Sequence, residues 1–90
     1  MASEHLIETQ ECNATWINAL WHFRDVEDVR TVFMGAIPVY HYSRLDRLSE
    51  KHVIISMAND GQAHQVDMAR AFGFGVATVR RWQQSYDRRG

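Results

Sequence analysis

Apolar positions along residues 62–86 recur at intervals of three and four residues, the spacing that places them on one side of an α-helix. The stretch "QVDMARAFGFGVATVRRW" holds two such runs, with Gly73 between them. Because glycine leaves the right-handed backbone region without steric cost, it can end one helix and redirect the chain. The pattern therefore predicts one helix over residues 64–72 and a second over about residues 76–86.

The spacing of small and apolar residues predicts how these two helices pack against each other. Two helices that meet steeply through a short turn need a small residue at their closest approach, and Ala69 supplies it. Gly73 follows four residues later and Val79 six residues after that. This spacing is typical of a helix-turn-helix, and we expect Ala69, Phe72, Val79 and Trp82 to be buried together.

The opposite face of the second helix is basic. It carries Arg80, Arg81, Gln84 and Arg88 once the apolar residues are turned inward. Such side chains reach phosphate oxygens and guanine edges. An ordinary helical hairpin, packed for stability alone, would explain the apolar residues but not this basic face. We therefore predict DNA binding.

Charge is distributed unevenly along the chain, and the distribution favours this interpretation. The 90 residues have a formal net charge of −1, which is unusual for a nucleic-acid binder. Residues 1–29 contain six acidic residues and one arginine, a net charge of −5, whereas residues 30–90 have a net charge of +4. The positive charge thus lies in the same part of the chain as the two-helix unit, and charge distribution bears on partner choice more than the total does.

The stretch "QVDMARAFGFGVATVRRWQQSYDRRG" resembles the helix-turn-helix of insertion-sequence transposases and related homeodomain-like regulators, and with less specific features the resemblance covers residues 31–90. A recognition helix of this kind reads bases through its first turn and a half. The family commonly has serine where Gly75 stands, so a capping oxygen and its phosphate contact are absent here. Arg81 is the best candidate for a bidentate guanine contact. The resemblance implies that the DNA-binding residues are Gly75, Val76, Ala77, Thr78, Arg80, Arg81, Gln84, Arg88 and Arg89.

Upstream of this unit the pattern predicts a hairpin and one more helix. Residues 31–42 form two β-prone runs on either side of a short glycine-containing connection, and Pro38 favours an edge position for the second run. Residues 43–61 have the apolar periodicity of a helix, with Ser43 and Asp46 at the spacing of a capping box.

Residues 15–23 fit either a helix face through Trp16, Leu20 and Phe23 or a strand. We therefore expect a mainly α protein with a small β-hairpin, in which a homeodomain-like three-helix unit containing the helix-turn-helix follows the hairpin. Two parts are expected along the chain. Residues 1–30 form an acidic N-terminal segment, a candidate part of a dimer interface, and residues 31–90 form the hairpin plus helix-turn-helix DNA-binding domain.

Cysteine content and hydropathy limit where the protein acts. The single Cys12 excludes an internal disulfide, no apolar run approaches membrane-spanning length, and the acidic N-terminus is unlike a signal peptide. These features predict a cytoplasmic protein, associated with the nucleoid if the source is bacterial.

Chemistry-bearing residues do not form a recognisable catalytic or metal-binding pattern. His41, His52 and His64 are not at zinc-ligand spacing, and the chain has neither a nucleophile triad order nor a glycine-rich phosphate loop. The chain also has no room for the carboxylate domain of a transposase. We expect no enzyme activity, cofactor, metal, membrane or small-molecule substrate.

The expected partners are double-stranded DNA and a second copy of the chain. DNA recognition would serve either a transposase-like protein or a small transcriptional regulator. The alternative is a protein-interaction or dimerisation module that does not bind DNA and uses the hairpin and the tryptophan-bearing segment.

Overall fold

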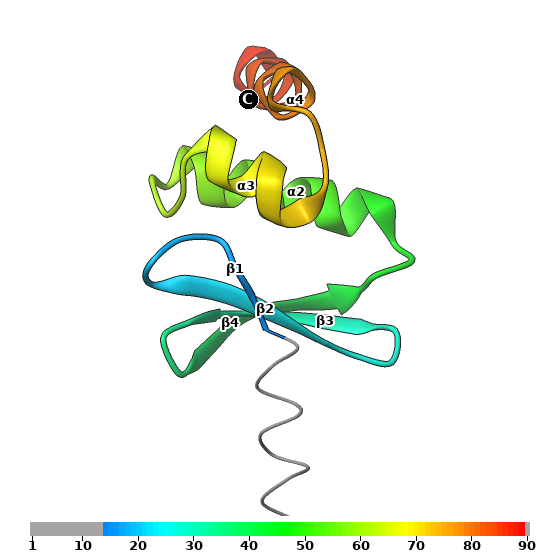
Figure 1. The fold of residues 1–90 in the computed structure, drawn as a ribbon. Coiled ribbons are helices and arrows are strands. Elements are labelled where there is room, and N and C mark those ends of the chain that lie inside the picture. Colours follow the sequence, from blue (N-terminus) through cyan, green and yellow to red (C-terminus); the bar gives the residue numbers. More distant parts are fainter. Residues whose placement is uncertain (1–13, 90) are drawn as a thin grey trace, which may run out of the picture.

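The computed structural model describes the backbone of residues 14–89 and the side chains of residues 14–86. Within that range the chain forms a four-stranded antiparallel sheet followed by three helices (Figure 1). The strands are β1 (Thr15–Trp16), β2 (Trp21–Val26), β3 (Val29–Met34) and β4 (Ile37–Ser43), and the helices are α2 (Arg47–Asn59), α3 (Gln65–Phe72) and α4 (Val76–Arg89). The strand order is β1-β2-β3-β4, so each strand pairs with its neighbour along the chain.

The expectation of a mainly α protein with a small hairpin is wrong. The hairpin predicted over residues 31–42 is present as β3 and β4, but residues 15–26 add two further strands to the same sheet. The sequence of residues 15–23 fits either a helix or a strand, and the second half of β2, with Arg24 and Asp25, is charged and gives only a weak strand signal. In the structure Asp25 lies opposite Arg30 of β3, so tertiary pairing outweighs the weak strand signal.

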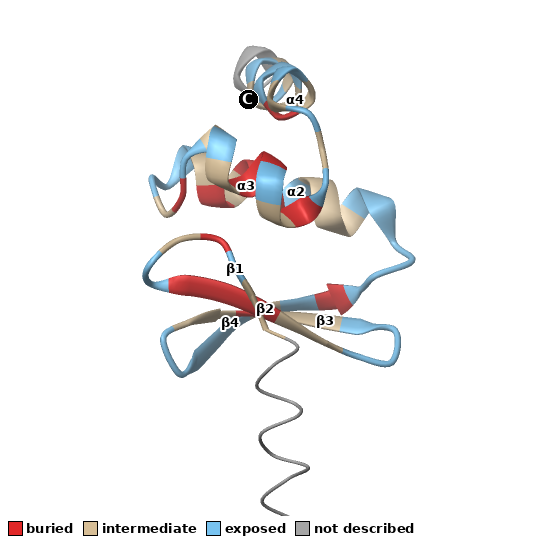
Figure 2. Cartoon of the chain, viewed as in Figure 1, coloured by how far each residue is buried: buried red, intermediate tan, exposed pale blue. Residues whose placement is uncertain are grey.

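One face of the sheet packs on α2 and α3, and α4 lies on the far side of these two helices from the sheet (Figure 1). The register places Phe23 opposite Val32, and Val32 opposite Tyr40, so these side chains share the helix-facing side. Figure 2 shows buried residues in the sheet and in the helices above it. The core cluster consists of Ile17, Trp21, Phe23, Val32, Tyr42, Ile54, Met57, Ala63, Met68, Ala69, Phe72 and Val79.

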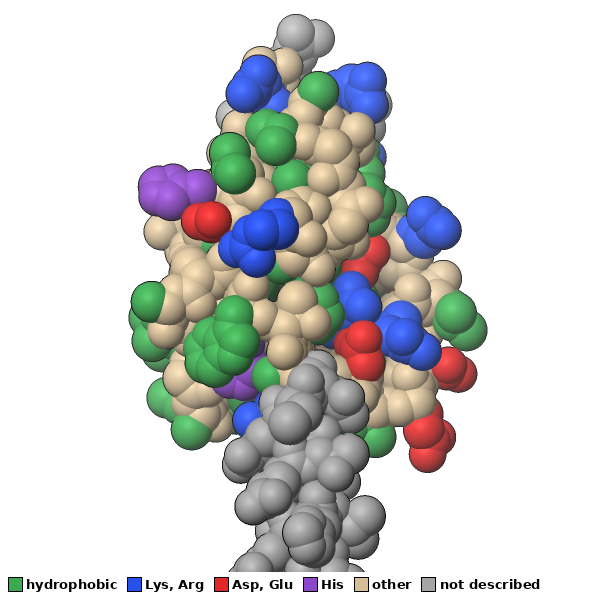
Figure 3. Space-filling view, viewed as in Figure 1, with side chains coloured by type: hydrophobic (Ala, Val, Ile, Leu, Met, Phe, Trp, Pro, Cys, Tyr) green, Lys and Arg blue, Asp and Glu red, His purple; other side chains and the backbone are tan. Residues whose placement is uncertain are grey.

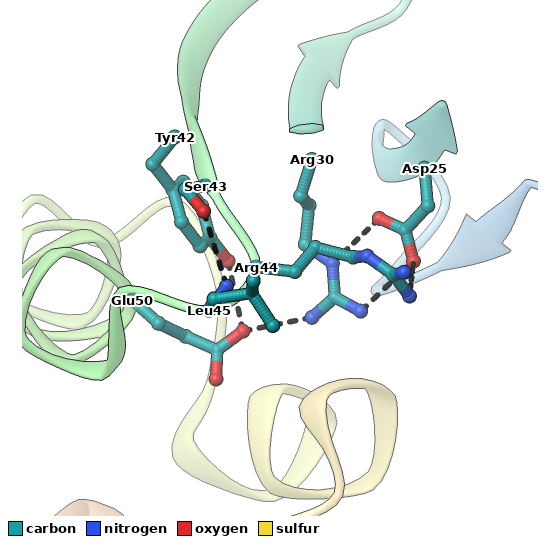
Figure 4. A network of polar contacts seen from close by, with 7 residues as sticks. All are labelled: Asp25, Arg30, Tyr42, Ser43, Arg44, Leu45 and Glu50. Atoms are coloured by element: carbon teal, nitrogen blue, oxygen red, sulfur yellow. Dashed lines mark hydrogen bonds and ion pairs between the residues drawn. The ribbon is translucent and has the colours of Figure 1, made fainter. Parts of the chain in front are cut away.

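A charged network links the sheet to α2 at one end of the core (Figure 4). Arg30 donates two hydrogen bonds to Asp25, at 2.7 and 2.9 Å, and one to Glu50 at 2.8 Å. The hydroxyl of Tyr42 donates to the same Glu50 oxygen at 3.0 Å, and the guanidinium lies 4.1 Å from the ring centroid of Phe23. Burial is the largest single influence on Arg30 and opposes its charge, but hydrogen bonding and charge attraction to Asp25, together with Tyr42, outweigh it and raise the pKa of the guanidinium.

Local signals set the boundaries of β4 and α2. Strand β4 is an edge strand, as Pro38 predicted. The capping box predicted from Ser43 is wrong, because Asp46 itself is the N-cap and accepts hydrogen bonds from the backbone N–H and hydroxyl of Ser49 at 3.1 and 2.7 Å. Helix α2 therefore begins at Arg47, three residues later than a cap at Ser43 would place it, and the connection before it stays exposed.

Candidate nucleic-acid interface

The unit formed by α3, the turn and α4 has the predicted break. Gly73 adopts a left-handed conformation with φ 82°, and its N–H and that of Phe74 both bond to the carbonyl of Ala69 at 2.9 Å. No atom lies within 4 Å of a Cβ built at Gly73, so the backbone conformation rather than crowding requires glycine there. The helices predicted over residues 64–72 and 76–86 are confirmed, although α4 continues to Arg89.

The apolar contact between α3 and α4 is confirmed in its centre. Ala69, Phe72 and Val79 are buried in the common core, as the spacing predicted. Trp82 is half-buried instead and packs at the edge of the core, with its ring edge-on to Phe74 at a centroid distance of 4.9 Å. The small side chain of Ala69 therefore lies where the two helices approach each other, and the bulky rings lie around it.

Side-chain amides attach α4 to both neighbouring helices. Gln83 accepts a hydrogen bond from Gln65 of α3 at 2.6 Å and donates one to Asn59 of α2 at 2.9 Å. The ammonium group of Lys51 lies 5.6 Å from the ring centroid of Trp82 and adds a contact from α2. These contacts lie on one side of α4 and set its orientation relative to the rest of the domain.

The other side of α4 is exposed. At the start of the helix and along one stripe, the exposed members of the predicted DNA-binding set are Gly75, Ala77, Arg80, Arg81 and Gln84. The steps of three and four residues from 77 to 84 keep these side chains on one helix face. The structure therefore brings two guanidinium groups and one amide together on a surface that packs against nothing else in the described part of the chain.

The other four predicted site residues are not part of this exposed stripe as described: two are half-buried, and the side chains of two lie outside the described residues. Val76 is half-buried and packs against the core cluster. Thr78 is also half-buried, and its hydroxyl accepts a long hydrogen bond of 3.5 Å from Arg81. Arg88 and Arg89 belong to the last turn of α4, but their side chains lie outside the described residues.

A second basic region, which the sequence prediction missed, lies where β4 leads into α2. Arg44 and Arg47 line a cleft whose other side includes Gly73 and Phe74 of the helix-turn-helix turn. Figure 3 shows Lys and Arg side chains here as well as over α4. The short sequence "SRLDR" carries two arginines three residues apart directly before the helix, and this is the signal that would have drawn attention to them.

Comparison with protein-family models, with curated proteins and with solved structures finds no match to this chain. Among residues 14–86, no group of three or more His, Cys, Asp or Glu side chains is arranged to hold a metal ion. Across the described helices, none combines the length and the apolar character that crossing a membrane requires. The fold and the site define a small domain in which three helices follow a four-stranded antiparallel sheet, and the last helix, joined to α3 by a glycine turn, presents cationic side chains at the surface.

Proposed function

We propose that this chain binds double-stranded DNA by placing the first turns of α4 in the major groove. The observation that carries the proposal is the division of α4 into two sides. One side packs on α2 and α3, while the opposite stripe of Arg80, Arg81 and Gln84 is exposed. A helix held by its inner face with donor-rich side chains on its outer face has the arrangement of a recognition helix.

Local charge supports the proposal despite the slightly negative total. Between residues 76 and 86, α4 carries two arginines and no acidic residue. The carboxylates of Asp25 and Glu50 are paired with Arg30 at the junction between sheet and helices. Because phosphate contacts supply most of the affinity of non-specific binding, the local cation density near α4 matters more than the net charge.

The proposed role is DNA recognition for a transposase-like protein or a small transcriptional regulator, in the cytoplasm and associated with the nucleoid if the source is bacterial. Arg81 is the proposed guanine reader, since a bidentate arginine contact discriminates against other bases. Ala77 adds only contact with a thymine methyl group. A single domain of this kind has modest sequence specificity, so a long site requires further contacts or a second copy.

The test is a binding titration on a duplex selected from a random pool and on a scrambled duplex, at two salt concentrations. Arg81→Ala is expected to lose about 1–3 kcal/mol on the selected site and to relax the preference at one base pair. Arg24→Gln is the control, because it removes the same charge from a side chain that lies over Phe33 on the other face of the sheet. Equal losses on both duplexes would show that Arg81 contacts phosphate only, and absence of salt-dependent binding by the wild type would contradict the proposal.

A protein-interaction module remains the second candidate, and the outer face of the sheet favours it. This face exposes Trp16 and Val26, which have no cover among the described residues. It lies at the opposite end of the domain from α4 (Figure 1). A dimer formed through this face would hold its two α4 helices at the distant ends of the assembly. Two recognition helices that read one inverted repeat must instead lie about 34 Å apart. Sedimentation with and without DNA distinguishes the candidates, since a pure interaction module associates without binding DNA.

A further inference from the structure

We infer that the connection between β4 and α2 forms a second contact with the same duplex, in which Arg44 and Arg47 hold the phosphate backbone beside the start of α4. The inference rests on the proposed DNA binding and adds a clamp outside the helix-turn-helix. Its basis is the cleft between this connection and the turn that precedes α4.

The position of the cleft relates it to the recognition helix. Arg44 and Arg47 come from the β4–α2 side, whereas Gly73 and Phe74 belong to the turn that leads into α4. A duplex that receives the first turn of α4 in its major groove has a sugar–phosphate backbone on either side of that helix. The sugar–phosphate backbone that passes this end of α4 then meets the cleft. The space beside Gly73 is open to it, because no atom lies within 4 Å of a Cβ built at this residue.

The two rim arginines of the cleft differ in their ion pairs. Arg30 at the base is paired with both Asp25 and Glu50, and its single positive charge balances one of their two negative charges (Figure 4). Arg44 makes only a long ion pair of 3.7 Å with Asp25, and its side chain is 41% exposed. Arg47 is exposed and makes no ion pair with any other described residue.

The acidic residue between the two arginines makes no ion pair with either of them. Asp46 accepts two hydrogen bonds from Ser49 as the N-cap of α2, and the hydroxyl of Ser49 comes first among the causes that lower the pKa of this carboxyl group. Its oxygens are thus directed to the helix start. Exposed guanidinium groups are suited to phosphate, because arginine offers several donors in a planar fork.

An exposed leucine at the cleft supports the main alternative to DNA, which is a protein partner. Leu45 is 75% exposed, and an apolar side chain beside arginines also suits a protein partner. DNA is favoured because the two arginines share the cleft with the turn that begins α4, so a single duplex reaches both cationic surfaces.

The experiment compares the wild type, Arg44→Gln/Arg47→Gln and the control Arg24→Gln on the selected and scrambled duplexes at several salt concentrations. Each lost phosphate contact is expected to weaken binding about tenfold at 0.1 M salt and to lower the salt slope by about one unit. The loss should be equal on both duplexes, since phosphate contacts carry no base information. Arg24→Gln keeps the affinity and slope of the wild type.

Folding is checked by circular dichroism melting, and Arg47→Gln alone serves as the second variant, because it leaves the Arg44–Asp25 pair in place. If Arg81→Ala weakens binding and the cleft variants do not, the clamp is wrong while DNA binding stands. A loss confined to the selected duplex also overturns the clamp, because it shows a base contact. If the wild type shows no salt-dependent binding, the DNA function and the clamp fail together.

Discussion

Each face of the sheet holds a titratable nitrogen-containing side chain largely away from solvent, and the two faces accommodate these side chains in opposite ways. On the helix-facing side, the side chain of Arg30 is 15% exposed and pairs with Asp25 and Glu50. On the outer side, His22 is 3% exposed and lies between Trp16 and Phe33, at ring-centroid distances of 4.4 and 5.1 Å. Neither ring nitrogen of His22 has a hydrogen-bond partner among the described residues.

The difference follows from what each face can supply. Arg30 keeps its charge because two carboxylates and an aromatic ring surround it, and removing both carboxylates would leave a largely buried charge without a partner. For His22, burial first and then the charge of Arg24 lower the pKa of the imidazole, which is therefore neutral over a wider pH range. The helix-facing side is thus held by directional polar contacts as well as apolar burial, and the outer side by ring stacking.

The largest expected effect comes from removing the aromatic contact that joins the helix-turn-helix to the sheet. Phe72 of α3 stacks on Phe23 of β2 at a centroid distance of 4.8 Å. Phe72→Ala should destabilise the domain by about 3–5 kcal/mol, because it removes a large buried ring and leaves a cavity. Urea unfolding measures the change, with the exposed Leu45→Ala as the control, expected within about 0.5 kcal/mol of the wild type. A loss below 1 kcal/mol would show that this stacking does not hold the layers together.

A smaller loss is expected from breaking the charged network. Arg30→Met should cost about 3 kcal/mol, the lower end of the range for a buried pair, because Asp25 and Glu50 remain partly buried without their partner. The control is Arg70→Ala, which removes hydrogen bonds to the carbonyls of Trp16 and Ile17 from a largely exposed guanidinium. Its expected loss is below 1 kcal/mol. Equal losses for the two variants in urea unfolding would contradict a special role for the Arg30 network.

The smallest effect is a pH dependence from the outer face. Because the pKa of His22 is lower in the folded protein than in the unfolded chain, the unfolded state binds more protons below about pH 6.5 and stability falls as the pH decreases. His22→Phe should flatten the change in melting temperature between pH 7.5 and 5.5. His41→Gln, at an exposed position on β4, should keep the wild-type profile. An unchanged profile for His22→Phe would mean that this ring does not contribute to the pH dependence.

The helix-turn-helix could be predicted from the sequence because its determinants are local. Ala69, Gly73 and Val79 lie within eleven residues, and the hydrogen bonds that define the turn join positions four and five residues apart. The hairpin over residues 31–42 was found for the same reason, since a short glycine-containing turn connects its strands. The basic stripe on α4 also follows from helix periodicity once its apolar side is recognised.

The rest of the sheet and the second basic region were decided by tertiary structure. Strand β2 exists because it pairs with β3 and packs beneath α3, whereas the local pattern of residues 15–23 fits a helix face as well as a strand. The two arginines of the cleft are visible in the sequence, but their place beside the turn before α4 depends on how α2 packs against the rest of the domain. Helical hydrogen bonds and helical periodicity are short-range, so the sequence alone determined the two helices, the turn at Gly73 and the basic stripe on α4. Strand pairing and the neutralisation of charges join residues far apart in the chain, so only the folded structure decided which arginines are paired and which remain free.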